Sequence, residues 1–300
     1  MCYNYGGLFM LFENVVGFCA DMLCEYGESC CNIRCTHPSG KCSGNCDNCL
    51  KEVHFSWEAD KRKDYCCEKL IYNYVSKFAR RYMNNAIIAL DYNIDVSQYP
   101  YFNVFSVGCG AAPDLMALES ICGNKQISYY GYDRNPLWRA IHNCITQYTR
   151  GTYNIESVFT RKDIFEVISE NNVPQNSFNV IFIQYLISHL YNTNQVDLID
   201  ELYQGLIDLV VSQKPNDSPF LIVINDIDSW NKGRSYFHKF LDYLEDAGYS
   251  GRAVAYSLYE NGDLGRERWG NNVSRRGRID YSYVETPTGF EGAALIIEVR

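Results

Sequence analysis

The sequence predicts an α/β fold in which a mainly parallel sheet has helices on both faces. The first observation is an alternation of short β-branched or aromatic runs with longer helical runs, from about residue 100 to the end of the chain. The second is a glycine turn at residues 108–112, between the first β run and a helix that begins at Pro113. The third is a pair of β runs at the C-terminus, which indicates an antiparallel strand at the edge of the sheet.

Seven strands are expected in this part of the chain, and each is a short run rich in β-branched and aromatic residues. They are residues 102–107, 126–132, 155–160, 179–183, 220–225, 252–259 and 293–299. Pro113 suits the first position of a helix, because the N–H that proline lacks would be unpaired there. Asn135 and Pro136 repeat this signal as N-cap and first residue. Helices are therefore expected from Pro113 and over 136–148, 195–212 and 234–247.

The first 98 residues differ in character from the rest. Residues 7–24 place apolar side chains at helical spacing, which predicts a helix packed on the rest of the protein. A cysteine-rich stretch follows. Residues 66–90 then form the clearest helix, with an apolar face opposite lysines and arginines. We expect a cysteine-rich segment over 1–67, a connecting amphipathic helix over 68–98 and an α/β domain over 99–300.

The glycine turn and a later acidic residue predict a nucleotide site. A strand, a tight glycine turn and a helix N-terminus let the backbone approach a ligand and direct free N–H groups toward it. Asp133 ends the second strand, 23 residues beyond Gly110. An acidic residue about 20 residues past such a turn is placed to accept hydrogen bonds from ribose hydroxyls.

These motifs resemble those of the class I S-adenosylmethionine (SAM)-dependent methyltransferases. The matching stretches are VGCGAAPDL at the turn, YYGYD at the acidic residue, and later TRKDIF and FNVIFIQYLISHL. The resemblance covers residues 100–300 and implies a Rossmann-like domain that binds SAM. Such enzymes often have an acidic residue two positions before the first glycine, where this chain has Ser106, and Ala112 replaces the third glycine. A nicotinamide-binding fold is the rival interpretation, but no substrate domain with a hydride-transfer site is apparent.

The resemblance implies roles by position. The two glycines of the turn would admit the methionine part, Asp133 the ribose, and Asp163 after the third strand the adenine amino group. Side chains at the end of the fourth strand would face the methyl group. The expected cofactor-binding residues are Gly108, Cys109, Gly110, Asp133, Arg134, Asp163, Ile164, Gln184 and Tyr185.

No catalytic residue is predicted, because methyl transfer depends largely on positioning the reactants. Cys109 lies within the turn and is expected to pack there. His189 is better explained as a histidine at a helix start that its neighbours satisfy.

The cysteines predict a zinc site. Eleven of the fourteen lie in the first 67 residues, and the N-terminus carries no basic leader. We therefore expect a cytoplasmic protein whose thiols stay reduced, so that clustered cysteines ligate metal. The C-x2-C spacing of Cys46 and Cys49 suits tetrahedral zinc, and the metal would supply folding energy that this polar segment lacks. Ligands for one or two ions are expected from among Cys35, Cys42, Cys46, Cys49 and Cys66; unpaired or redox thiols are the alternative.

One competing interpretation of these cysteines is an iron–sulfur cluster. The spacing of Cys42, Cys46 and Cys49 also matches the cluster motif of the radical SAM enzymes. Those enzymes bind SAM in a barrel of repeated βα units, which does not follow here. Asn48 stands where that family usually has an aromatic residue, and the additional cysteines favour a four-ligand zinc site.

An arginine-rich insert suggests the substrate. The net charge of −9 argues against unassisted wrapping of nucleic acid. Residues 261–292, between the last two strands, hold Trp269, Tyr281 and five arginines, a combination that suits phosphate and base contact. We expect a macromolecular substrate, with RNA favoured over protein; a solvated loop or a cover for the cofactor is about as probable.

Two further expectations concern activity and location. The main function hypothesis is an enzyme, and the alternative is a non-catalytic SAM- or nucleotide-binding sensor or partner protein. No uninterrupted apolar run is long enough to span a bilayer, so no membrane partner is expected.

Overall fold

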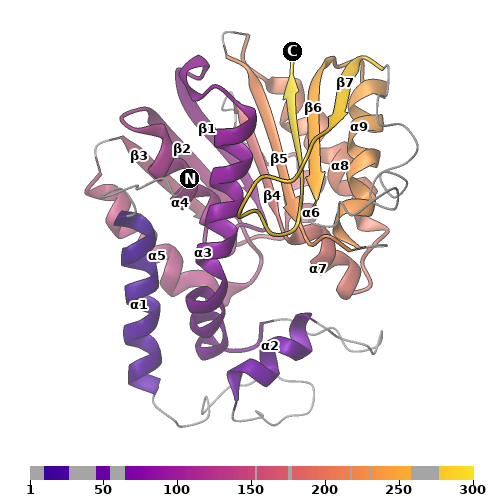
Figure 1. The fold of residues 1–300 in the computed structure, drawn as a ribbon. Coiled ribbons are helices and arrows are strands. Elements are labelled where there is room, and N and C mark those ends of the chain that lie inside the picture. The colour runs from indigo at the N-terminus through magenta and orange to yellow at the C-terminus, as the bar shows by residue number, and fades with distance from the viewer. Residues whose placement is uncertain are drawn as a thin grey trace.

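An eight-stranded sheet lies at the centre of the computed structural model, which describes residues 10–26, 45–54, 65–152, 154–174, 178–216, 218–229, 232–257 and 277–300. The strand order is β3-β2-β1-β4-β5-β8-β6-β7 (Figure 1). The strands are β1 (Tyr101–Val107), β2 (Gln126–Tyr132), β3 (Ile155–Thr160), β4 (Val180–Gln184), β5 (Phe220–Asp226), β6 (Gly251–Ser257), β7 (Ile279–Tyr283) and β8 (Ala293–Val299).

The first five strands are parallel, so their carboxyl ends share one edge of the sheet. β1 pairs with β2 on one side and with β4 on the other, and chain order reverses between those two neighbours. Ligands of open α/β sheets bind outside the carboxyl ends of the strands at such a switch point. The predicted α/β fold with a mainly parallel sheet is confirmed.

Two details of the predicted sheet are wrong. The described residues form eight strands, because Ile279–Tyr283 pairs in parallel with β6 as an additional edge strand. Its side chains alternate between buried and exposed, the pattern of a half-buried strand, although these residues fall within the insert expected from the sequence. The antiparallel strand is not at the edge either: β8 lies between β5 and β6, which explains its almost wholly buried sequence AALIIEV.

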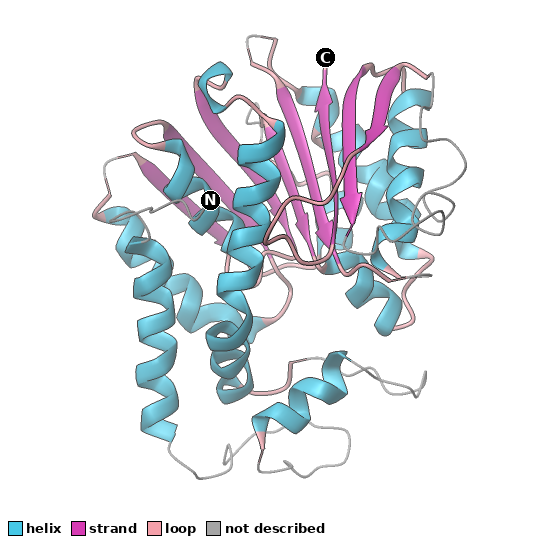
Figure 2. Cartoon of the chain, in the orientation of Figure 1, coloured by secondary structure: helices cyan, strands magenta, loops and turns pink. Residues whose placement is uncertain are grey.

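Helices cover both faces of the sheet (Figure 2). One core cluster joins α1, α3, α4 and α5 to the sheet, and the other joins α6, α7, α8 and α9 to its opposite face. The helices are α1 (Met10–Tyr26), α2 (Cys46–His54), α3 (Glu68–Asn93), α4 (Pro113–Cys122), α5 (Arg139–Arg150), α6 (Ile164–Ser169), α7 (Leu186–Asn192), α8 (Leu198–Leu209) and α9 (Phe237–Asp246). Short 3₁₀ turns lie at Val96–Gln98, Pro136–Trp138, Val211–Gln213 and Gly233–Tyr236.

The long helix α3 is the predicted amphipathic helix, and it is part of the main core. Its apolar face packs against α1, α4 and the sheet, with Ile71, Val75 and Leu90 almost fully buried. The first turns of α3 lie beside α2, below the sheet as drawn in Figure 1. α3 therefore connects the cysteine-rich region to the carboxyl edge of the sheet.

The C-x2-C pair lies in a helix, whereas the sequence suggested a tight turn. Cys46 and Cys49 fall in the first turn of α2. The side chain of Asn45 accepts hydrogen bonds from the N–H groups of Asp47 and Asn48, at 2.8 and 3.4 Å, and so caps the helix.

None of the helices in the described ranges is both long and apolar enough to cross a bilayer.

Candidate functional site

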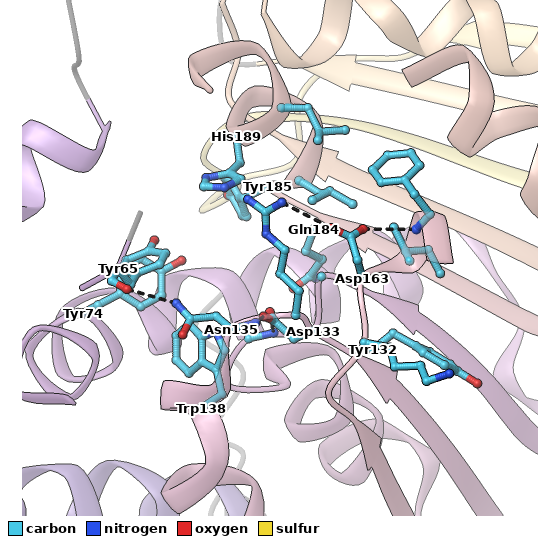
Figure 3. Close-up of a pocket in the computed structure, with 18 residues that line it drawn as sticks. Tyr65, Tyr74, Tyr132, Asp133, Asn135, Trp138, Asp163, Gln184, Tyr185 and His189 are labelled. Carbon is cyan, nitrogen blue, oxygen red and sulfur yellow. Dashed lines mark hydrogen bonds and ion pairs between the residues drawn. The ribbon is translucent and has the colours of Figure 1, made fainter. Parts of the chain in front are cut away.

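A pocket opens at the carboxyl edge of the sheet, where β1, β2, β3 and β4 end beside the first half of α3 (Figure 3). Its volume is about 810 Å³, counting the space open to solvent. The lining residues are Tyr65, Tyr74, Gly108, Gly110, Tyr132, Asp133, Arg134, Asn135, Trp138, Lys162, Asp163, Ile164, Phe165, Gln184, Tyr185, Leu186, His189 and Leu190. Eight of the nine predicted cofactor residues are among them; Cys109 is not.

The glycine turn forms one wall of this pocket in a conformation that side chains disfavour. Gly108, Gly110 and Ala112 have φ values of 63°, 50° and 54°, in the left-handed region. A Cβ atom on Gly108 would lie 3.2 Å from the side chain of Leu186. The turn therefore requires small residues, and its backbone faces the pocket directly.

Asp133 follows β2 and is held against this turn. Its Oδ2 atom accepts a hydrogen bond from the Gly110 N–H at 3.0 Å, and its Oδ1 atom accepts one from the Asn135 N–H at 2.9 Å. The carboxylate is thus fixed at the pocket wall by two backbone donors. One of the N–H groups expected to face a ligand, that of Gly110, is instead bonded within the protein.

An ion pair joins the ends of β2 and β3. The guanidinium of Arg134 lies 3.3 Å from Asp163 Oδ2, with both side chains partly exposed. The other oxygen of Asp163 accepts from the Phe165 N–H at 3.1 Å and caps α6. A partly exposed pair of this kind contributes little to stability, on the order of 0–1 kcal/mol. The ion pair matters for the site because Arg134 and Asp163 both line the pocket.

Gln184 and Tyr185 lie where β4 ends. Both amide atoms of Gln184 are buried and make no hydrogen bond with any part of the chain that the structure describes. Tyr185 has a φ of 55°, in the left-handed region that residues other than glycine seldom adopt. Residues with such strained backbone angles are often found at functional sites.

The ring and hydroxyl of Tyr185 are both fixed. The ring packs 3.9 Å from that of Tyr82, and the hydroxyl accepts a hydrogen bond from Asn85 Nδ2 at 2.6 Å. Asn85 also bonds the backbone N–H and C=O of Glu291. Burial, more than any nearby charge, raises the pKa of Tyr185 far above its usual value, so its phenol stays protonated at neutral pH.

Cys109 packs beneath the turn and does not line the pocket, although the resemblance placed it among the cofactor-binding residues. The side chain is buried beneath the turn, and burial followed by the charge of Asp133 raises the pKa of its thiol well above the usual range. The backbone carbonyl of Gly110 accepts a hydrogen bond from His142 Nε2 at 2.7 Å. Burial lowers the pKa of His142 to about 4, so the imidazole is neutral and carries its proton on Nε2.

Gly131 of β2 makes room for this arrangement, which leads to a first prediction. A Cβ atom there would lie 2.8 Å from Cys109 Sγ and 2.9 Å from the ring of Tyr129. Gly131→Ala should destabilise the protein by about 1–3 kcal/mol, the usual cost of overpacking, and displace the turn. Urea unfolding measures the first effect. Gly17→Ala, at a position without a positive φ where an added Cβ meets nothing within 4 Å, is the control and should lose no stability, and an equal loss of stability in both variants would contradict the packing explanation.

Sequence reasoning missed several residues at or behind the pocket. Tyr74 was assigned only to the apolar face of its helix, and Tyr65 and Trp138 carried no motif. Asp114 is almost completely buried behind the turn, where Tyr129 donates a hydrogen bond to its Oδ1 atom at 2.9 Å and its Oδ2 atom has no partner within the described chain. The resembled enzymes often carry an acidic residue at the position of Ser106, and Asp114 brings a carboxyl group to that neighbourhood from the next helix.

The described residues do not support the predicted zinc site. Within the described ranges, no three histidine, cysteine, aspartate or glutamate side chains converge in a way that would hold a metal ion. Cys46, Cys49 and Cys66 are described, and they border one small apolar cluster with Leu50. Cys35 and Cys42 lie outside the described residues.

Comparison with known proteins finds likeness in structure but not in sequence. No family model matches the chain, and no curated protein matches it. The plantazolicin methyltransferase BpumL in complex with SAH has a TM-score of 0.44 and 16% identity, covering 95% of this chain and 100% of that one. The pyocyanin biosynthetic protein PhzM has a TM-score of 0.47 and 12% identity, covering 99% and 71%. A SAM-dependent methyltransferase from Aquifex aeolicus has a TM-score of 0.36 and 16% identity, covering 68% and 85%.

Proposed function

We propose that the protein is a SAM-dependent methyltransferase. The observation that carries this proposal is the Asp133 carboxylate, held against the glycine turn inside a pocket at the switch point of the sheet. A nucleotide ribose meets folds of this kind at that position. The two backbone N–H groups fix the carboxylate at the pocket wall, in a position to meet ribose hydroxyls.

The remaining contacts would divide between adenine and methionine. Asp163 and Ile164 border the place for the adenine, and the planar guanidinium of Arg134 is suited to stack on a base. Gly108 and Gly110 would admit the methionine part along the turn. Tyr185 is held protonated at the end of β4, so its phenol serves as a hydrogen-bonding group and not as a base.

When bound, SAM would supply a methyl group that is already activated by the sulfonium. The protein would then accelerate transfer mainly by aligning the acceptor with that methyl group. Gln184, whose amide has no partner within the described chain, is the polar group best placed to orient an acceptor or the methionine.

The test combines cofactor binding with methyl transfer. We expect the purified protein to bind SAM and S-adenosylhomocysteine (SAH) in calorimetry. With methyl-labelled SAM and a cell extract, we expect label to move into an acceptor, and nuclease- and protease-treated extracts identify its class. Binding without transfer to any fraction would favour the non-catalytic sensor instead. Absence of binding would overturn the proposal.

For the cysteine-rich segment we propose a structural zinc ion, completed by thiolates from outside the described residues. The support is that Cys46, Cys49, Cys66 and Cys67 border one small apolar cluster, although by themselves they do not converge on an ion within the described ranges. Elemental analysis should find stoichiometric zinc and no stoichiometric iron, and a chelator should lower the melting temperature, because metal binding and folding are coupled. A brown protein with visible absorption and acid-labile sulfide would indicate an iron–sulfur cluster instead.

An RNA substrate and a cytoplasmic location stay predictions. Four of the five arginines of the insert, and Trp269, lie outside the described residues. The fifth, Arg278, donates a hydrogen bond to the Gly248 carbonyl, and Tyr281 is buried in β7.

A further inference from the structure

We infer that the methyl acceptor presents a flat, uncharged aromatic ring, which binds against a wall of aromatic side chains in the pocket. This inference rests on the proposed methyl transfer and specifies its substrate class. The wall consists of Tyr65, Tyr74, Trp138 and Tyr185, and all four line the pocket. Figure 3 shows Tyr65, Tyr74 and Trp138 on the opposite side of Asp133 from Asp163.

The rings of the wall support one another. Tyr65 and Tyr74 lie 4.9 Å apart between ring centroids, and each lies about 6 Å from Trp138. Behind them, Tyr82 packs against both Tyr74 and Tyr185. The four lining rings come from Tyr65, three residues before α3, from α3 itself, from the turn after β2 and from the end of β4. A single amphipathic helix does not explain such a convergence, which forms a preorganised surface for a planar group.

Charge is confined to the other side of the pocket. The lining residues with full charges are Asp133, Arg134, Lys162 and Asp163, and all of them follow β2 or β3. Arg134 pairs with Asp163, and Lys162 pairs with Glu170. Among the described lining residues, no carboxylate comes from α3, from the segment just before it or from β4. A cationic acceptor would find aromatic faces there but no counter-charge.

The hydroxyl groups of Tyr74 in the wall and of Tyr82 behind it are also neutral. Burial is the main cause that raises the pKa of both well above the usual value for tyrosine, so both stay protonated. An anionic ring would lose its hydration here without compensation, and a cationic ring would gain contacts with aromatic faces but meet no carboxylate from this side of the pocket. The surface therefore favours a ring that is itself uncharged.

The unpartnered amide of Gln184 indicates that the ring carries a polar atom. Its Oε1 and Nε2 atoms are buried beside Tyr185 and lack hydrogen bonds within the described chain. In the neighbouring strand its register partner, Asn225, is fully buried with both amide atoms in the same state. Buried polar groups without partners cost free energy, so a ligand atom that bonds Gln184 would be favoured. A heteroaromatic ring, or one with a polar substituent, meets both requirements.

The test uses quinoline, a flat heteroaromatic compound that is uncharged at neutral pH, as the probe. Calorimetry on protein saturated with SAH should detect quinoline binding. Tyr74→Leu should weaken that binding by roughly tenfold or more, the size of the loss of one stacking partner, and leave SAH binding unchanged. Tyr65→Leu, from outside the helix, gives the same test if Tyr74→Leu does not fold.

Two matched variants serve as controls. Tyr74→Phe keeps the ring and should bind quinoline like the parent. Phe78→Leu removes a ring that packs on Tyr74 and Tyr82 but does not line the pocket, and it should also bind quinoline normally.

Several results would overturn the inference. They are undetectable quinoline binding, equal binding by Tyr74→Leu, or a loss of SAH binding in that variant, which would assign the wall to the cofactor. Tighter binding of N-methylquinolinium would indicate a cation site, and preferential binding of single-stranded oligoadenylate would indicate nucleic acid. If the parent binds no SAH at all, the proposed function itself fails, and this is seen before any probe is added.

Discussion

Asp133→Ala is expected to weaken SAH binding by about 1.5–3 kcal/mol, roughly tenfold to more than a hundredfold in Kd. The variant loses the charge-assisted hydrogen bonds from the ribose hydroxyls. It also frees the N–H groups of Gly110 and Asn135, which the carboxylate now holds at 3.0 and 2.9 Å. Both effects act in the same direction. Calorimetry at constant ionic strength measures the change.

Asp133→Asn separates these two effects. The asparagine keeps the size of the side chain and one acceptor oxygen but carries no charge, so its SAH affinity should lie between those of the parent and of Asp133→Ala. Thermal unfolding of all three proteins shows whether the turn stays in place. SAH binding equal to that of the parent in Asp133→Ala would contradict the ribose assignment.

The second large effect concerns stability and the buried carboxyl of Asp114. Burial raises its pKa from 3.8 to about 6, although the hydrogen bond from Tyr129 lowers it. Between about pH 4 and pH 6 the folded protein therefore binds more protons at this group than the unfolded chain does, and its stability falls as the pH rises. Asp114→Asn removes that dependence. Relative to the parent it should gain about 3 kcal/mol across this interval and keep the gain above pH 6.

Urea unfolding of both proteins over this pH range measures the difference directly, which matters because other groups titrate there as well. Asp226 is fully buried, with a pKa that burial raises to about 6, and it acts in the same direction in both proteins. His142, with its pKa lowered to about 4 by burial, acts in the opposite direction.

A suitable control is Asp95→Asn. Hydrogen bonds from Ser97 lower the pKa of Asp95, so this variant should lose stability relative to the parent as the pH rises. A difference between Asp114→Asn and the parent that does not change with pH would contradict the buried-carboxylate explanation.

Local signals in the sequence predicted the parts of the site that depend on backbone geometry. Gly108 and Gly110 revealed the turn because positive φ angles favour glycine, and Asp133 followed from its distance along the chain. The strands that precede the turn and Asp133 could be predicted because buried parallel strands are short apolar runs. The structure brings these residues together as the pattern required.

Parts of the site that depend on contacts between distant segments were not predicted. Tyr74 looked like any apolar residue of a helix, and nothing in its neighbours indicates that Trp138 would meet it, 6.0 Å away. The left-handed conformation of Tyr185 is equally hidden, because that conformation is normally associated with glycine. β7 was missed because its short alternating run stands directly after an arginine-rich stretch. Tertiary packing fixes all of these features.

Asn85 ties together three parts of the molecule that are far apart in the sequence. It joins α3 to Tyr185 at the end of β4 and to Glu291 just before β8. The domain boundary at residue 99 that the sequence predicts would therefore divide the pocket between two parts of the chain. It would not separate an independent segment from the pocket. A fragment beginning there would keep all the proposed cofactor contacts, together with Trp138 and Tyr185, but would lose Tyr65 and Tyr74. Half of the proposed acceptor wall is thus encoded before the residues proposed to bind the cofactor, so exchange of α3 and the residues just before it should change acceptor preference more than cofactor affinity.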